Sequence, residues 1–81
     1  LPNFPKDLLN KYVLNCVSKI QKMTDISSRN RVVRLVSVYI QSLIRNKIEL
    51  FDNVLIEVGR FSMDFDKIKE ANALYKLIKS I

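Results

Sequence analysis

The sequence predicts an all-α fold of four antiparallel helices arranged as two stacked αα-hairpins, a bundle similar to a short helical-repeat array. Apolar residues recur at helical spacing in four successive segments, and no segment alternates like a strand. The connections are short, so successive helices are expected to be antiparallel neighbours. With 81 residues, one glycine and two prolines, residues 1–81 are expected to form a single all-α domain.

The first helix is expected from about Pro5 to Met23, because proline suits the first turn of a helix. Its apolar face is predicted to turn inward, with Lys6, Asn10, Lys19 and Lys22 away from it. This face contains Leu9, Val13, Cys16, Ile20 and Met23, flanked by Leu8, Tyr12 and Val17. Cys16 is the only cysteine and is interpreted as a small buried hydrophobe. In the linker at residues 24–28, Ser27 or Ser28 is expected to cap the next helix.

The second helix, expected to run to about Asn46, is apolar almost all the way round. A surface helix normally has a broad polar face, so this one is predicted to be a central element covered on several sides. One narrow polar stripe is expected to be its solvent-facing edge: Asn30, Arg34, Ser37, Gln41 and Arg45. Asn46 is expected in the left-handed conformation that ends a helix.

The third helix is expected after Asp52 as N-cap and to about Asp64, with Val54, Val58, Phe61 and Phe65 as its core stripe and Leu55 beside it. Gly59 marks either a close approach or a tolerant site. The fourth helix, Lys67 to about Ser80, is expected to be capped by Asp66. Its inward face contains Ile68, Ala71, Leu74, Tyr75 and Ile78, widened by Leu77 and Ile81.

The residue types present argue against an enzyme. Histidine is absent, there is one cysteine, and no glycine-rich phosphate loop occurs, so no catalytic residue, metal site or cofactor is expected. Asp64 and Asp66 straddle a helix junction and are interpreted as end-caps. No apolar run approaches the ~18 residues that span a membrane. The net charge of +6 fits either a solvated surface or an acidic partner, RNA included, although the basic residues recur singly.

Two surfaces are candidates for partner contact. The first is the stripe of Arg34, Gln41 and Arg45, with Arg31 and Lys47 beside it. These side chains are otherwise solvent-facing residues, and Arg31 could instead pair with Asp25. The second candidate is the apolar pair Ile56 and Met63, on either side of Gly59, which a partner's amphipathic helix or a further helix of a larger domain could cover. Tyr12, Tyr39 and Tyr75 are interpreted as packing residues.

Residues 41–48 read Gln-Ser-Leu-Ile-Arg-Asn-Lys-Ile, and shorter motifs flank them in order: Leu1-Pro2, Asn15-Cys16, the run from Asn30 to Val36, and Ile56-Glu57-Val58. Together these motifs resemble the C-terminal domain of subunit eleven of the CCR–NOT deadenylase complex, the Not-eleven family. The eight residues from Gln41 to Ile48 match without change, and the resemblance covers essentially the whole chain. The chain departs from the family pattern at Gly59, at residues 24–28 and at residues 49–53.

The resemblance implies a non-catalytic adaptor module in a complex that shortens the poly(A) tails of messenger RNA and represses translation. It implies recruitment of partner proteins, gametogenetin-binding-type proteins among them, while subunit ten and the scaffold subunit contact the rest of the full-length chain. The expected location is the cytoplasm, with the nucleus as a second compartment.

The family's domain also has helices upstream of the Leu-Pro start, so residues 1–81 are expected to be the C-terminal part of a larger helical domain. The face left uncovered is expected to self-associate or to bind a partner. The alternative functions are a weak RNA-binding module and a self-associating structural bundle.

Overall fold

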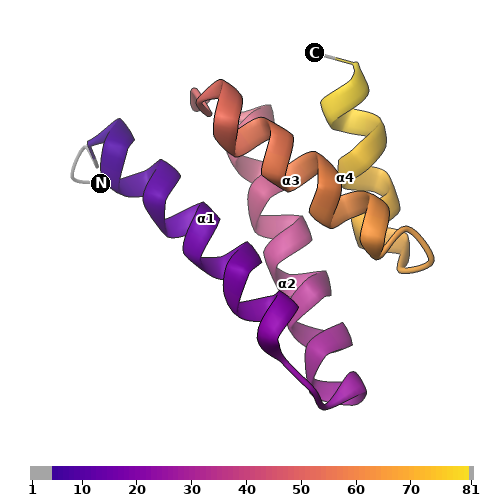
Figure 1. Cartoon of the computed structure of the whole chain (residues 1–81). Helices are drawn as coiled ribbons and strands as arrows, with labels where there is room; N and C mark the ends of the chain where they lie inside the picture. Colours follow the sequence, from indigo (N-terminus) through magenta and orange to yellow (C-terminus); the bar gives the residue numbers. More distant parts are fainter. Residues whose placement is uncertain (1–4, 81) are drawn as a thin grey trace.

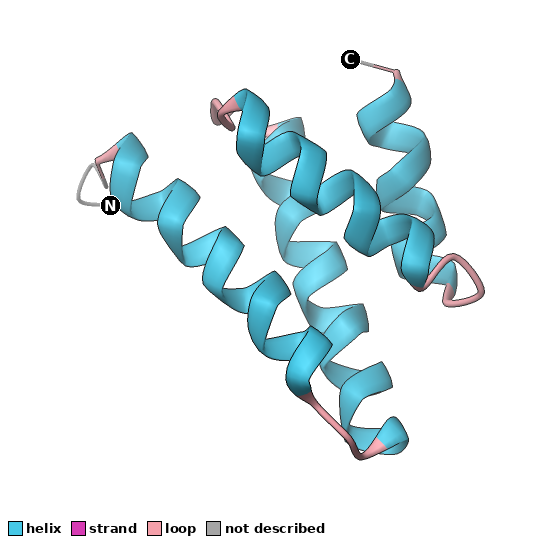
Figure 2. Cartoon of the chain, in the orientation of Figure 1, coloured by secondary structure: helices cyan, strands magenta, loops and turns pink. Residues whose placement is uncertain are grey.

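The computed structural model describes residues 5–80 and contains four helices (Figure 1). They are α1 (Lys6–Lys22), α2 (Ile26–Arg45), α3 (Asp52–Asp64) and α4 (Lys69–Lys79). Only short loops join them, and no strand occurs within residues 5–80 (Figure 2). The predicted all-α class is therefore confirmed. Three residues named in the sequence predictions, Leu1, Pro2 and Ile81, lie outside the described residues.

The four helices form two hairpins that stack on each other. In Figure 1, α1 and α2 meet at the lower end of the molecule, and α3 and α4 form the second hairpin beside them. Helix α1 packs on α2 and α3, and helix α4 packs on the same two helices. Helix α2 has 20 residues and is therefore about 30 Å long, close to the longest dimension of the molecule, 34 Å. It packs on α1 within its own hairpin and on α4 of the other hairpin, as expected for two stacked hairpins.

The core contains residues that recur every three or four positions on each helix. This spacing places them on one side of a helix, where they are removed from water against the neighbouring helices. No helix among the described residues is both long and apolar enough to cross a membrane. The fully buried hydrophobic side chains are Val13, Val17 and Ile20 of α1, Val33 and Ile40 of α2, Val54, Val58 and Phe61 of α3, and Ala71 and Leu74 of α4.

The prediction that α2 exposes only its polar stripe is wrong. Ser37 is fully buried and Gln41 nearly so, whereas Leu35 and Val38 are exposed. Ser37 lies four positions after Val33 on the same face and is therefore carried into the core, where its hydroxyl has no hydrogen-bond partner. The polar stripe is one helical face, as predicted, but it lies at the boundary with α4: Ser37 and Gln41 turn inward, whereas Arg34 and Arg45 are exposed.

The predicted outward position of Asn10 is also wrong, because this side chain is buried between α1 and the α2–α3 loop. Its Nδ2 donates to the carbonyl oxygens of Lys6, at 2.8 Å, and Glu49, at 3.3 Å, and its Oδ1 accepts from the backbone N–H of Phe51 at 2.8 Å. Asn10 therefore joins α1 to the loop. Leu9 and Cys16, predicted for the core face, are only half-buried.

A salt bridge lies beside Asn10 on the surface. Lys6 Nζ donates to Glu49 Oε1 at 2.7 Å, and both side chains are exposed. The hydrogen bond, with the opposite charges, raises the pKa of Lys6 and lowers the pKa of Glu49. An exposed pair of this kind stabilises little, so the buried Asn10 side chain is the stronger connection between α1 and the loop.

Several predicted helix ends were wrong. Asp25, not Ser27 or Ser28, caps α2, and it accepts from the backbone N–H of Ser28 at 3.2 Å and from its hydroxyl at 2.6 Å. Helix α3 begins at Asp52 and α4 at Lys69, and neither start has a side-chain capping bond, so the predicted caps at Asp52 and Asp66 are not formed. Asp25 therefore bonds Ser28, and no pair with Arg31 occurs among the described residues.

At the end of α2, Asn46 is not left-handed; the following Lys47 has φ 60°. The N–H of Lys47 donates to Ile44 O and that of Ile48 to Leu43 O, both at 3.0 Å. This pair of bonds is the Schellman ending, in which the left-handed residue comes one position after the C-cap. At Gly59, an added Cβ would meet nothing within 4 Å, so this glycine marks a tolerant site and not a close approach.

Candidate protein-binding surfaces

The positive charge of the molecule resides on one hairpin. Residues 1–46 contain eight Lys and Arg against two Asp and Glu, whereas residues 47–81 contain six of each. Helix α2 has four arginines and no acidic residue. The net charge of +6 therefore belongs to the α1–α2 hairpin. Although the basic residues recur singly along the chain, counting charges separately for each half would have found this asymmetry.

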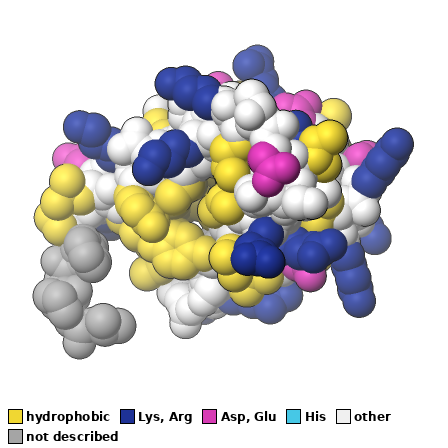
Figure 3. Space-filling view, turned by 90° about the horizontal axis from the view of Figure 1, so that it is seen from below, with side chains coloured by type: hydrophobic (Ala, Val, Ile, Leu, Met, Phe, Trp, Pro, Cys, Tyr) yellow, Lys and Arg dark blue, Asp and Glu magenta, His cyan; other side chains and the backbone are white. Residues whose placement is uncertain are grey.

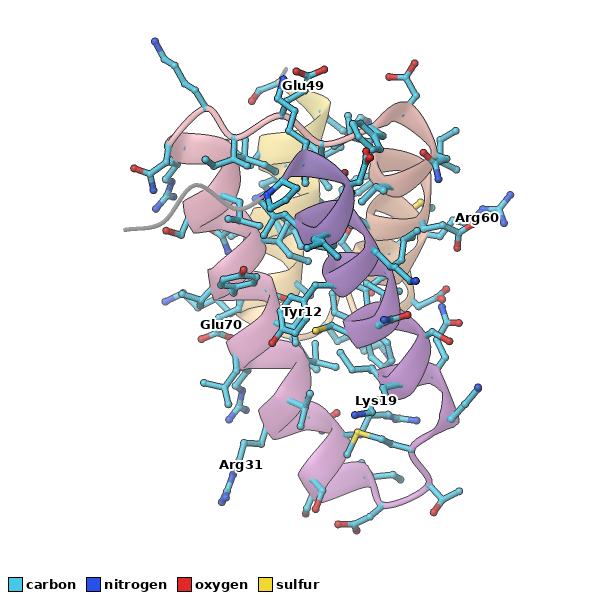
Figure 4. The ribbon with its side chains drawn as sticks, turned by 90° about the vertical axis from the view of Figure 1, so that its left-hand side faces the viewer. Tyr12, Lys19, Arg31, Glu49, Arg60 and Glu70 are labelled. Carbon is cyan, nitrogen blue, oxygen red and sulfur yellow. The ribbon has the colours of Figure 1, made fainter. Side chains whose placement is uncertain are left out.

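A shallow groove lies between α1 and α2 on this cationic hairpin. Its volume is about 570 Å³, and it is open to solvent and lined mainly by apolar atoms. Figure 4 shows Tyr12 between the two ribbons. The lining residues are Leu8, Leu9, Lys11, Tyr12 and Asn15 from α1 and Tyr39 from α2.

Two tyrosines form the middle of this groove. The rings of Tyr12 and Tyr39 meet edge to face, with centroids 6.0 Å apart and an interplanar angle of 88°. Tyr12 is 55% exposed and Tyr39 is 39% exposed, so the prediction that both are packing residues is wrong for the outer part of each ring. Tyr75 is half-buried, and Lys79 Nζ lies 5.3 Å from its ring centroid.

The Tyr12 hydroxyl stays protonated at neutral pH. A side-chain hydrogen bond with Cys16, followed by the charge of the Cys16 thiolate form, raises the pKa of Tyr12 above its ordinary value. A protonated phenol donates one hydrogen bond. The groove is therefore lined by a neutral phenol among its apolar groups and by the ammonium group of Lys11.

Exposed apolar side chains continue from the groove along α2. Leu35 lies one turn before Tyr39 and is 65% exposed, whereas the exposed Val38 lies on the α4 side of α2, beside Gln41 and Arg45. The space-filling view from below shows hydrophobic side chains gathered in a contiguous area, with Lys and Arg at its edge (Figure 3). In Figure 4, Lys19 and Arg31 lie on the side of the molecule that presents α1 and α2. We name the apolar face by its residues: Leu8, Tyr12, Leu35 and Tyr39.

The sequence predictions missed this apolar face because α2 was expected to be covered there. Leu8 and Tyr12 were placed beside the core face of α1, and Leu35 and Val38 were counted as buried. The signal that was present is the wide apolar arc of α2, which exceeds what two neighbouring helices can cover.

The predicted stripe of α2 lies at the boundary with α4. Gln41 Nε2 donates to the backbone oxygen of Glu70 at 3.0 Å, and Arg45 Nη2 lies 3.5 Å from Gln41 Oε1. Arg34 Nε is 3.9 Å from Glu70 Oε1. Gln41 therefore serves the α2–α4 contact, whereas Arg34 and Arg45 are exposed. Partner contact by Arg34, Gln41, Arg45 and Lys47 stays a prediction.

The second predicted surface lies on α3. Ile56 is 58% exposed, and Met63 is exposed to a similar extent. Arg60 lies between them in the sequence, points away from the molecule in Figure 4, and is 3.9 Å from Glu57. This pair of apolar side chains is on the other hairpin from the groove, and its contact with a partner also stays a prediction.

Within residues 5–80, no three His, Cys, Asp or Glu side chains lie close enough together to hold a metal ion. The polar groups of the described part instead serve helix ends and helix contacts, as Asn10, Asp25 and Gln41 do. The candidate binding features of the described part are therefore the apolar face and the cations around it.

Comparisons with known proteins point to one family. The model of the family described as CCR4-NOT transcription complex subunit 11 matches residues 2–79. The protein named CCR4-NOT transcription complex subunit 11 from Dictyostelium discoideum is 41% identical over 76 residues, which cover 94% of this chain. The matched region is 12% of that relative, so the chain spans only a small part of its length.

Proposed function

This chain belongs to the family of CCR4-NOT transcription complex subunit 11, and from that premise we propose that it is a non-catalytic module that recruits partner proteins to the complex. In this proposal the module serves messenger RNA deadenylation and translational repression, in the cytoplasm and the nucleus. Subunit ten and the scaffold subunit are contacted by the rest of the full-length protein. Gametogenetin-binding-type proteins are among the partners proposed for this chain.

The observation that supports the proposal is the apolar face beside the α1–α2 groove. It places four large hydrophobic side chains at the surface of a small bundle. Contiguous exposed apolar surface of this kind marks interaction sites in soluble proteins, because leaving it in water costs free energy that a partner removes.

RNA is the second candidate partner, favoured by the net charge of the first hairpin. Neutralising phosphates releases counterions, so RNA binding of this kind weakens steeply as salt rises. The exposed apolar side chains are not needed for phosphate contact and favour a protein instead. A titration of single-stranded RNA at several salt concentrations separates the two, because a slope near zero removes the RNA candidate.

Self-association of the chain stays a prediction, and the charge of the first hairpin opposes it. Two copies that meet through their apolar faces bring two sets of cations together, and like charges disfavour the contact. Analytical sedimentation over a range of protein concentrations measures this directly. A dimer that strengthens at high salt would be the sign of self-association limited by repulsion.

The proposed function is tested by affinity purification of the full-length protein from its own cells, with and without residues 1–81. We expect the truncated protein to retain the subunits of the complex and to lose other proteins. If truncation leaves the set of co-purified proteins unchanged, the proposal is wrong.

The predicted stripe is tested in the same purification with the double variant Arg34→Glu, Arg45→Glu. Both side chains are exposed, and the matched control is Lys76→Glu, Lys79→Glu on α4. Loss of a partner only from the α2 variant assigns the stripe a role in binding. An unchanged set of partners removes the stripe from consideration.

A further inference from the structure

We infer that the groove between α1 and α2 binds an acidic amphipathic helix of a partner protein. The inference rests on the proposed function and names the chemistry of the partner. It concerns the apolar face of Leu8, Tyr12, Leu35 and Tyr39, which is distinct from the predicted stripe and from the α3 pair.

The spacing of the apolar face favours a helix as the bound element. Leu8 and Tyr12 are one turn apart on α1, and Leu35 and Tyr39 are one turn apart on α2. Each pair forms a ridge, and the groove between two antiparallel helices accepts the side chains of a third helix. The groove is lined from Leu8 to Asn15, about 10 Å along α1, which corresponds to roughly two turns of a partner helix.

The charges around the apolar face favour an acidic partner. Lys11 lines the groove, and Lys19 and Arg31 are exposed on the same two helices. The two acidic residues of this hairpin are Asp7, in the first turn of α1, and Asp25, which is occupied as the cap of α2. Carboxylates at the edges of a bound helix would therefore meet cations on both sides.

The side chains at the edge are free to make such contacts. Among the described residues, the ion pairs of α1 and α2 are Lys6 with Glu49 and Arg34 with Glu70, and the second is long, at 3.9 Å. Lys11, Lys19 and Arg31 take part in none of them. A partner carboxylate that reaches these groups need not break an existing salt bridge, which lowers the cost of binding.

The partner chemistry is tested by selecting a fully randomised display library of peptides of about 16 residues, roughly four helical turns, against the 81-residue chain. We expect the enriched peptides to carry apolar residues at helical spacing and an excess of Asp and Glu. Enrichment of basic peptides, of peptides without helical spacing, or of none would overturn the inference.

The location is tested with the most enriched peptide, synthesised with a fluorescent label and measured by anisotropy. Leu35→Asp is compared with Ile56→Asp, because each replaces an exposed apolar side chain on a helix. Leu35 is 65% exposed and Ile56 is 58% exposed. Neither change touches the core, and circular dichroism checks both folds. We expect Leu35→Asp to weaken binding roughly tenfold or more and Ile56→Asp to have little effect. The opposite order would place the site on α3.

The charge contribution is tested with Arg31→Glu against Arg60→Glu, two exposed arginines on different hairpins. We expect only Arg31→Glu to weaken the peptide and to reduce the salt dependence of binding. Equal losses from both variants would indicate attraction by net charge alone and would count against a groove.

A labelled single-stranded RNA of similar length serves as the competing probe. Tighter binding of RNA than of the selected peptide, lost in Leu35→Asp, would overturn the inference in favour of a nucleic acid. The purification of the full-length protein separates this outcome from the proposed function. Partners lost on truncation but retained in full-length Leu35→Asp would leave the recruiting function standing and remove the groove as its site.

Discussion

At the residue scale, burial of a few polar side chains decides how the helices are joined. Asn10 is buried with both ends of its amide hydrogen-bonded across the α1–loop contact. Ser37 is buried without a partner, and Gln41 reaches the backbone of α4. These three residues have the polarity of surface residues, and their neighbours on the helix decide their burial.

Replacing Asn10 by alanine is expected to lower the free energy of unfolding by about 2 kcal/mol, because the N–H of Phe51 and the carbonyl of Glu49 lose their partner. Urea denaturation followed by circular dichroism measures the change. Asn15→Ala is the control, since Asn15 is exposed on the same helix and should cost little. Equal effects of the two variants would show that the Asn10 bonds contribute nothing specific.

At the element scale, each helix follows from its apolar spacing, while its ends depend on local hydrogen bonds. Asp25 caps α2 through Ser28, and Lys47 ends it in the left-handed conformation. Hydrogen bonds from the Ser28 hydroxyl and N–H lower the pKa of Asp25. The carboxylate form is therefore the form that stabilises the start of the helix.

Asp25→Ala is expected to lower the Tm by a few degrees at neutral pH, and Ser27→Ala, the control at a position without a capping bond, to change it little. Because folding lowers the Asp25 pKa, its contribution is complete above the unfolded pKa of about 4 and is lost as the pH falls through the folded value. The Tm difference between wild type and Asp25→Ala should therefore shrink below about pH 4. A difference that persists unchanged in acid would contradict the cap.

At the scale of the whole molecule, α4 links the two hairpins, since it packs on both α2 and α3. Its central side chains Ala71 and Leu74 are fully buried. The two hairpins differ in charge, although they share a core. The first carries the whole net charge, and the second has equal numbers of basic and acidic residues. One hairpin is therefore suited to an acidic partner while both share one core.

Leu74→Ala is expected to lower the free energy of unfolding by about 3 kcal/mol through the cavity that it leaves in the shared core. In a urea titration followed by NMR, amide signals from α1 and α3 should lose intensity at the same midpoint, because the hairpins unfold together. Met63→Ala, at an exposed position, is the control. Separate midpoints for the two hairpins would contradict a shared core.

By itself, the sequence determined the fold class, the four helices and the family. Helical periodicity is a local property, and the motif from Gln41 to Ile48 is read without any structure. The charge asymmetry of the two halves was also present in the sequence. The core stripes of α3 and α4 were predicted correctly, because most of their apolar residues share one face, and Ile56 and Met63 of α3 lie away from it.

Only the tertiary structure decided which sides of α1 and α2 are covered. A helix that is apolar most of the way round has several faces that could turn inward, and the neighbouring helices α3 and α4 select among them. That selection buries Asn10, Ser37 and Gln41 and leaves Leu35 and Tyr12 exposed. The groove exists because two helices meet there, so its residues could not be brought together from the spacing on either helix alone.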